Sequence, residues 1–147
     1  MAGRVEIMSF AYSRGAAPEA DLVADMRFLR NPHWQDDLRH LTGLDPEVGE
    51  YISGDAAYAE ALGKIEAQLL DLLSRGDGRA CVRAAFGCTG GRHRSVHAAE
   101  RIAARLRAAG FSPRLRHRDL ATPPADGIER SAEATDAGPG ADGFQGG

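Results

Sequence analysis

The alternation of helical and extended patterns is the feature that most limits what this chain can fold into. Apolar residues recur at spacings of three and four through residues 58–73, which predicts an amphipathic helix that ends near Gly76. The apolar run ACVRAAFG at residues 80–87 then predicts a buried strand, and a second helical pattern over residues 96–106 ends at Gly110. Strands separated by crossover helices form parallel sheets, so we expect an α/β fold.

Shorter segments complete the predicted sheet. Residues 5–12 (VEIMSFAY) are rich in β-branched and aromatic side chains and predict a strand, as do residues 22–26 and 112–119. We therefore expect a small, mainly parallel sheet flanked by helices, with a strand, a loop and a helix over residues 80–109. Asp55 is the expected N-cap of the first helix.

Length and composition support one folded domain followed by a tail. The chain has 147 residues, 43% of them hydrophobic, which suffices for one core and is short for two. Residues 121–147 are rich in proline, glycine and alanine and hold five acidic residues against one basic residue, a net charge of −4. We therefore expect a domain over residues 1–120 and a disordered tail over residues 121–147.

Composition also bears on localisation and on cofactors. No apolar run approaches the roughly 20 residues needed to cross a bilayer, and the N-terminus lacks the basic and apolar regions of a secretory signal. We therefore expect a cytoplasmic protein without membrane contact. Cys81 and Cys88 have no partner cysteine or histidine at zinc-site spacing, so we expect no disulfide, metal ion or cofactor.

The segment GCTGGRHRSV joins the predicted buried strand to the second helix and has the composition of an anion-binding loop. Such a junction presents free backbone N–H groups and the positive end of the helix dipole. Gly90 and Gly91 let the backbone turn tightly and approach a ligand, and the Arg94 guanidinium can hold two phosphate oxygens. Thr89 and Ser95 supply hydroxyl groups, and Ser95 can also cap the helix. We expect a phosphorylated ligand here, with an ordinary strand-to-helix turn as the alternative.

The same segment contains the pattern C-x-x-G-x-x-R-S, which begins at Cys88 and resembles the phosphate-binding loop of cysteine-dependent phosphatases. In that chemistry a thiolate attacks phosphorus, while the helix N-terminus and the arginine bind the phosphoryl oxygens. Gly87 stands where those enzymes usually carry histidine, and the general acid would have to be Asp25 or Asp119. The interpretation that we prefer makes Cys88 a small buried residue that closes a strand, so no catalytic residue is assigned.

Five blocks of sequence resemble, in order and spacing, the C-terminal domain of the RapZ family of bacterial RNase adapter proteins. The blocks are SFAYSRG, ADMRFLRNPHW, LTGLDPEV, GCTGGRHRSV and RHRDL, which begin at residue 9 and end at residue 120, and the resemblance covers nearly all of residues 5–120. The resemblance implies a domain that binds glucosamine-6-phosphate and, in well-studied members, small regulatory RNAs and the endoribonuclease RNase E. It also implies homo-oligomers assembled partly through this domain.

The chain departs from the pattern of that family in three respects. It lacks the Walker-loop domain that precedes this region in full-length relatives, so we do not expect it to hydrolyse nucleotides. Ser13 and Arg14 follow the aromatic residue of the first block, where relatives often carry lysine. RNA-binding relatives continue past the last block with a basic end, whereas this chain continues with an acidic one, which weakens the expectation of RNA binding.

The remaining blocks supply candidate pocket residues. Asp25 and Arg27 share a strand face, so the carboxylate can hold sugar hydroxyls or an ammonium and the arginine can reach phosphate, unless the two form a structural ion pair. The resemblance favours a place for His33 in a rigid turn facing the ligand, with a simply exposed side chain as the alternative, and His93 can donate to phosphate, more favourably when protonated. Trp34 is expected in the core. A rim for phosphate or RNA, or else a solvated edge strand, is expected from Arg92, Arg114, Arg116, His117 and Arg118.

The sequence thus predicts a single α/β domain that binds a phosphorylated metabolite, an amino-sugar phosphate by the resemblance, and reports its presence to a partner. An enzyme is the less favoured interpretation. An RNA-binding adapter and a cysteine-dependent phosphatase are the alternatives. The expected ligand-binding residues are Asp25, Arg27, His33, Cys88, Thr89, Gly90, Gly91, His93, Arg94 and Ser95.

Overall fold

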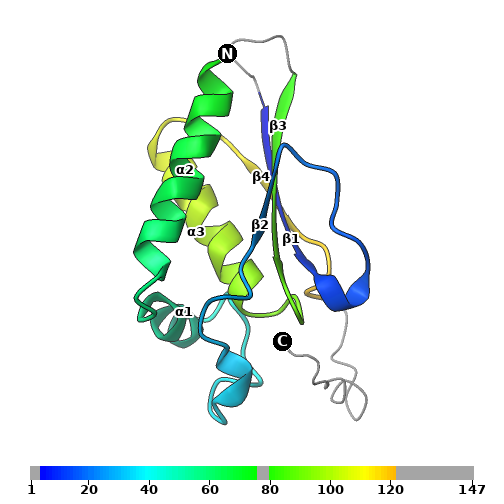
Figure 1. The fold of residues 1–147 in the computed structure, drawn as a ribbon, viewed down its shortest axis with the longest axis vertical. Coiled ribbons are helices and arrows are strands. Elements are labelled where there is room, and N and C mark those ends of the chain that lie inside the picture. The colour runs from blue at the N-terminus through cyan, green and yellow to red at the C-terminus, as the bar shows by residue number, and fades with distance from the viewer. Residues whose placement is uncertain (1–3, 76–79, 122–147) are drawn as a thin grey trace.

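The computed structural model describes residues 4–75 and 80–121, which form a four-stranded sheet flanked by helices (Figure 1). The sheet has the order β2-β3-β1-β4, and every neighbouring pair of strands is parallel. The expected α/β fold is confirmed, with a sheet that is wholly parallel. The expected acidic tail lies almost entirely outside the described residues. In chain order the elements are β1 (Arg4–Ala11), β2 (Leu22–Asp25), α1 (Pro46–Ser53), α2 (Tyr58–Ser74), β3 (Cys81–Cys88), α3 (Arg94–Ala108) and β4 (Arg114–His117).

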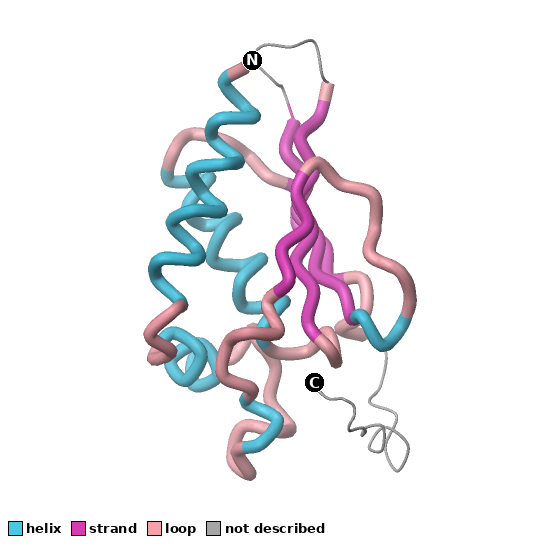
Figure 2. The backbone as a smooth tube through the Cα atoms, viewed as in Figure 1, coloured by secondary structure: helices cyan, strands magenta, loops and turns pink. Residues whose placement is uncertain are grey.

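The helices gather on one side of the sheet, and the connection from β1 to β2 runs along the other side (Figure 2). The alternation of side chains along β1 follows this arrangement, because Val5 and Ile7 are buried while Glu6 between them is partly exposed. The same alternation in β3 buries Val82 and exposes Arg83. One face of the sheet therefore forms the core, and the other face carries charged side chains.

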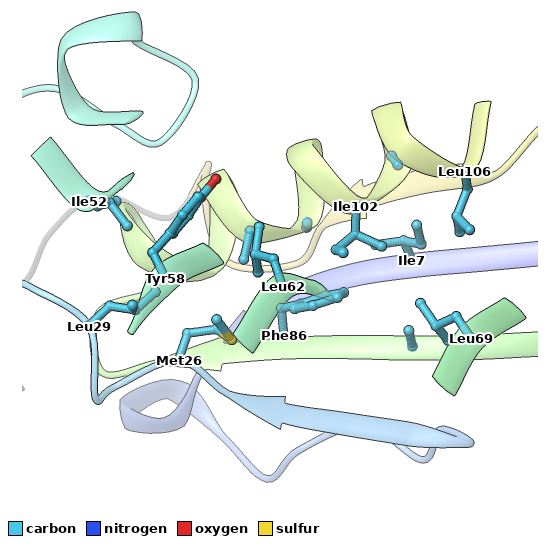
Figure 3. Packing of buried hydrophobic residues seen from close by; sticks show 14 of the residues in the cluster. Ile7, Met26, Leu29, Ile52, Tyr58, Leu62, Leu69, Phe86, Ile102 and Leu106 are labelled. Atoms are coloured by element: carbon cyan, nitrogen blue, oxygen red, sulfur yellow. The ribbon is translucent and has the colours of Figure 1, made fainter. Parts of the chain in front are cut away.

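The core lies between the central strands and the helices α2 and α3 (Figure 3). Ile7 of β1 and Phe86 of β3 meet Leu62 and Leu69 of α2 and Ile102 of α3, and all five side chains are fully buried. Each such side chain stabilises the fold by about 1.5–3 kcal/mol relative to an exposed position. The three- and four-residue spacing of apolar residues in both helices is thus explained by this single packed layer.

The start of α2 differs from the expectation. Ala57, and not Asp55, occupies the N-cap position, and Tyr58 is the first helical residue. The Asp55 carboxylate instead accepts hydrogen bonds from the backbone N–H groups of Ala57 (2.9 Å) and Arg30 (2.9 Å). Asp55 therefore orders the turn before the helix and ties it to the segment that follows β2.

Helix α1 was absent from the sequence-based assignment, although the sequence carries a start signal for it. Pro46 occupies the first helical position after Asp45, and Glu47 lies in the first turn, a pattern typical of helix N-termini. Two buried residues, Val48 and Ile52, pack the short helix against the core. Its eight residues hold too few apolar positions for the periodicity to stand out.

The last strand is shorter than expected and is tied to its neighbours by a chain of hydrogen bonds. His117 Nε2 donates to Glu100 of α3 (2.8 Å), and His117 Nδ1 lies 2.7 Å from Ser9 Oγ of β1. Ser9 is fully buried, so this serine–histidine–glutamate chain joins β4 to β1 and α3 and offers no exposed hydroxyl. Arg118 follows the strand and leaves the face shared by Arg114 and Arg116.

The described residues contain neither a membrane-spanning helix nor a metal-binding cluster. Within residues 4–75 and 80–121, no helix has the length and apolar character needed to span a membrane. Over the same ranges, no cluster of three or more histidine, cysteine or acidic side chains is arranged to hold a metal ion.

Candidate anion-binding site

The loop between β3 and α3 lies at the edge of the sheet where the carboxyl ends of the parallel strands meet. Open α/β sheets bind ligands at this edge. Helix α3 has 15 residues and begins at Arg94, so the loop leads directly into the positive end of a full-length helix dipole. Gly90 is exposed, and a Cβ atom placed there would meet nothing within 4 Å. The loop therefore has open space on the side where a ligand can approach.

Two glycines let this loop pack closely against the end of β1. Gly91 has a φ of 68°, and a Cβ atom there would lie 2.7 Å from the Cβ atom of Ala11. A Cβ atom at Gly87 would collide with the ring of Phe10 and lie 2.6 Å from the ring of Tyr12. Glycine is therefore required at both positions by steric contact, and at Gly91 also by the backbone conformation.

Backbone hydrogen bonds hold the loop from three sides. The carbonyl of Thr89 accepts from the backbone N–H of Ser13 (3.2 Å) and from the Ser13 hydroxyl (2.6 Å). The carbonyl of Gly87 accepts from Met26 N–H (2.8 Å), and that of Arg92 accepts from Gly43 N–H (2.7 Å). These bonds occupy the carbonyls of Gly87, Thr89 and Arg92 and fix the loop against its neighbours.

Cys88 is the last residue of β3 and is only 2% exposed. Its thiol donates to Ser95 Oγ (3.2 Å) and accepts from the backbone N–H of Ser95 (3.4 Å). His93 occupies the N-cap position of α3, so the expectation that Ser95 caps the helix through its own side chain is wrong. Ser95 lies inside the first turn, where it pairs with the thiol.

Arg94 is buried under the segment that follows β2, which differs from the free fork expected for it. Its Nη1 donates to the carbonyls of Arg27 (2.6 Å) and Leu29 (3.2 Å), and the residue is 4% exposed. Burial lowers the pKa of Arg94, and the neighbouring Cys88 and Asp25 oppose that effect. One terminal nitrogen is thus committed to the protein backbone, and the guanidinium joins the loop to residues 27–29.

Asp25 and Arg27 form a two-point ion pair beside the loop. Arg27 Nε donates to Asp25 Oδ1 (2.9 Å) and Arg27 Nη2 donates to Asp25 Oδ2 (2.7 Å), with both side chains about half exposed. Partial burial opposes ionisation of Asp25, but the hydrogen bonds from Arg27 outweigh it and hold its pKa below the usual value. The ion-pair alternative is therefore present in the structure, and the pair stands at the surface where a ligand can reach it.

Tyr12 joins this cluster and was missed in the sequence. The Arg27 guanidinium carbon lies 4.0 Å from the centroid of the Tyr12 ring. Partial burial, and next the negative charge of Asp25, raise the pKa of the Tyr12 hydroxyl. Tyr12 was assigned to the first strand, but it begins a 3-10 turn over Tyr12–Arg14 instead. The sequence carried one signal for Tyr12: it directly follows a strand, and that strand ends at the carboxyl edge of the sheet, where α/β domains bind ligands.

His93 is buried, which disfavours the protonated form that was expected to donate best to phosphate. Burial, and next the charge of Arg92, lower its pKa to about 3. A hydrogen bond with the backbone of Leu41 raises the pKa, so the Leu41 carbonyl accepts from the ring. Among buried side-chain nitrogens and oxygens of the described residues, only His93 Nε2 lacks a partner.

His33 lies in a short 3-10 helix, Pro32–Trp34, as the Asn31-Pro32 pair suggested. The Asn31 side chain accepts from His33 N–H (3.1 Å) and orders the turn. Partial burial, and next the charges of Arg39 and Arg94, lower the pKa of His33. Trp34 is 63% exposed, so its expected place in the core is wrong: the turn projects from the domain and the indole packs edge-on against His33.

The residues expected at a rim divide into two groups. Arg114 and Arg116 are exposed on the sheet face away from the helices, where Arg114 lies 3.9 Å from Glu6. Arg118 points inward and donates to the carbonyls of Ala16 (2.8 Å) and Ala11 (3.4 Å). The ring of His117 lies between Ser9 Oγ and the Glu100 carboxylate. The backbone carbonyl of Arg92 accepts a hydrogen bond from Gly43 N–H.

The two carboxylates considered as general acids are both engaged. Asp119 is 8% exposed, and its Oδ2 accepts from the backbone N–H of Ala11 (2.7 Å) and from Arg118 Nε (3.0 Å). Asp25 is held by Arg27. Neither carboxyl is placed as a free proton donor beside Cys88.

The fold and the loop define a parallel α/β domain with a candidate anion-binding junction between a central strand, β3, and the helix α3. The chain belongs to the RapZ C-terminal domain family, whose sequence profile matches residues 3–121.

Several curated relatives support this membership. The chain is 59% identical over 116 residues to a nucleotide-binding protein of Rhizorhabdus wittichii. The aligned region covers 78% of this chain and 37% of the relative. It is 59% identical over 127 residues to a nucleotide-binding protein of Novosphingobium aromaticivorans, covering 85% of this chain and 42% of the relative. A third, from Sphingopyxis alaskensis, is 52% identical over 127 residues, covering 85% and 40%. The chain thus spans about two fifths of the length of these relatives.

Proposed function

We propose that this domain binds a phosphorylated metabolite of the amino-sugar phosphate class, such as glucosamine-6-phosphate, and reports its presence to a regulatory partner. The observation that carries the proposal is the β3–α3 loop, where exposed Gly90 has open space next to the N-terminus of α3. Free N–H groups and a helix dipole favour phosphate there. The relatives are named nucleotide-binding proteins, and a nucleotide offers the same phosphate group.

The remaining site residues have distinct roles in this proposal. Phosphate lies against the loop backbone from Thr89 to Gly91, and half-exposed Arg27 turns toward it from Asp25. Asp25 is then released to accept from a sugar hydroxyl or an ammonium. His33 and neutral His93 border the sugar, while Cys88, Arg94 and Ser95 hold the loop in shape. The proposed unit is the domain over residues 1–120, acting in the cytoplasm as a homo-oligomer.

A phosphatase is the second candidate, favoured by the position of Cys88 at the N-terminus of α3 with Ser95 donating to its sulfur (3.4 Å). The burial of Cys88 and the engagement of Asp25 and Asp119 in other hydrogen bonds favour binding over hydrolysis. Assays of phosphate release from glucosamine-6-phosphate by the wild type and by Cys88→Ser separate the two candidates. Release that disappears in Cys88→Ser would establish the enzyme.

The first prediction tests the loop by placing a negative charge where phosphate binds. Gly90→Asp fits sterically, because a Cβ atom at Gly90 meets nothing within 4 Å. Two unit charges 4 Å apart repel by about 4 kcal/mol at an effective dielectric constant near 20, so the affinity for glucosamine-6-phosphate should fall by about tenfold or more. Calorimetric titration measures it.

The matched control is Gly63→Asp, because Gly63 of α2 also has nothing within 4 Å of a built Cβ atom and lies on another element. This variant should bind like the wild type. Equal affinity in Gly90→Asp and the wild type would overturn the assignment of the loop.

A further inference from the structure

Tyr12 is fixed at the carboxyl end of β1 by contacts on both sides of its ring. Its ring centroid lies 4.8 Å from that of Phe10 in an edge-on arrangement, and Phe10 is fully buried. The ring also fills the space that a side chain at Gly87 would need. The next residue, Ser13, is bonded twice to the Thr89 carbonyl of the loop. Tyr12 therefore has a defined position relative to the β3–α3 loop.

The exposed face of this ring carries the Arg27 guanidinium. The distance of 4.0 Å from guanidinium carbon to ring centroid is well inside the range of a cation–π contact. Arg27 lies in an exposed segment after β2, and its other contact is the ion pair with Asp25. Without the ring, a long side chain at this position has many rotamers that point into solvent.

The backbone next to Arg27 is tied to the end of β3 that leads into the loop. The N–H group of the preceding residue, Met26, donates to the Gly87 carbonyl (2.8 Å). The backbone carbonyl of Arg27 is anchored by Arg94 Nη1 (2.6 Å), so the backbone from which the side chain extends is also fixed. The mobile part of Arg27 is only its side chain, and the Tyr12 ring limits where that side chain goes.

We infer that Tyr12 is a positioning residue for ligand binding: its ring is the surface along which Arg27 moves from Asp25 to the phosphate of the bound metabolite. This inference rests on the proposed function. The face of the aromatic ring positions the Arg27 guanidinium, so phenylalanine can replace tyrosine and the hydroxyl is not required. Tyr12 thereby adds the aromatic residue that directly follows β1 to a site built from β2, β3 and α3.

The experiment is a double-mutant cycle on glucosamine-6-phosphate affinity, measured by calorimetry. Tyr12→Leu should weaken binding about two- to fivefold, which is the worth of an exposed cation–π contact. Tyr12→Phe should restore affinity to within about twofold, since it keeps the ring face. Arg27→Ala should cost about tenfold or more, because it removes a charged hydrogen-bond donor. In the Arg27→Ala background, Tyr12→Leu should cause no further loss.

A matched control tests whether the loss of any arginine–aromatic contact would weaken ligand binding, or only the loss of the contact between Tyr12 and Arg27. The Arg30 guanidinium lies 5.4 Å from the Tyr51 ring centroid, so Tyr51→Leu removes a contact of the same kind on α1 and should leave affinity unchanged. Thermal unfolding of every variant checks folding. Tyr12→Met, which also lacks a ring, replaces Tyr12→Leu if that variant does not fold.

The possible failures are distinguishable. The inference is overturned if Tyr12→Leu lowers the affinity equally in the wild type and in Arg27→Ala. It is also overturned if Tyr12→Leu leaves the affinity unchanged while Arg27→Ala lowers it. Both outcomes leave the proposed function standing. Failure of Tyr12→Phe to restore affinity would also overturn the inference. Absence of any sugar-phosphate binding by the wild type would overturn both.

Discussion

Gly90 and Gly91 are adjacent in the loop but differ in how much they tolerate a side chain, and stability measurements on their alanine variants should show this difference. Gly91→Ala should lower the free energy of unfolding by about 1–3 kcal/mol, because a left-handed conformation is strained for alanine. Its new methyl would also crowd Ala11, which lies 2.7 Å from the built Cβ atom. Gly90→Ala has neither problem and should change the free energy of unfolding by less than about 0.5 kcal/mol. Urea denaturation measures both, and equal effects would contradict the loop geometry.

The charge of single residues decides how the site can hold an anion. Arg27 is half exposed and Arg94 is buried with one nitrogen bonded to carbonyls, although both are arginines beside the same loop. His93 is neutral, with a pKa near 3. Of these three residues, Arg27 therefore has the most exposed positive side chain.

At the scale of elements, His97 joins the three helices. It extends from α3, its Nε2 lies 2.7 Å from the hydroxyl of Tyr58 of α2, and a Cβ atom at Gly49 of α1 would lie 2.9 Å from its ring. Burial, and next the charge of Arg101, lower the pKa of His97 to about 4. The packing of the helices therefore depends on a neutral imidazole.

This dependence predicts acid sensitivity. Between pH 6.5 and pH 4 the unfolded chain protonates this histidine and the folded protein does not, so stability is fully present above pH 6.5 and falls as pH is lowered. Buried His93 acts in the same direction. His97→Gln should be less stable at pH 7 and lose less stability than the wild type on going to pH 5. Thermal unfolding at both pH values checks this, with exposed His40→Gln as control. A steeper loss in His97→Gln would exclude the explanation.

At the scale of the whole molecule, the sheet has one face covered by helices and one face with arginines. Arg83 Nε lies 3.0 Å from the Glu6 carboxylate, with Arg4 and Arg114 also within 4 Å of it, while Arg116 is exposed on the same face. Four arginines against one glutamate make this face the surface that suits RNA in the adapter alternative.

Residues 122–147 bear on that alternative through charge alone. They hold five acidic residues and one basic residue, a net charge of −4. Deleting them should raise non-specific RNA affinity at low salt, and the difference should fade as salt shortens the Debye length below about 8 Å. Filter binding of one RNA to both proteins over a salt series measures this. Equal affinities at every salt concentration would show that the acidic segment does not compete with RNA.

Periodic patterns predicted the long elements because each buries one continuous side. Residues 58–73 and 96–106 read as helices since α2 and α3 cover the same sheet face. Helix α1, with its two buried residues, and the exposed turn holding Trp34 gave no such pattern, because short segments contact the core at few points.

The parallel α/β fold and the strand, loop and helix around Gly90 and Gly91 follow from the amino-acid sequence. Local propensity and hydrophobic spacing are enough for these, since they depend on residues close together in the chain, whereas the family was indicated by the resemblance of five sequence blocks. The state of the site residues follows from the tertiary structure alone. The tertiary structure buries Arg94 against the carbonyls of residues 27 and 29, neutralises His93, and brings Tyr12 under Arg27. Those outcomes depend on burial and on partners 15 to 67 positions away, which no local pattern contains.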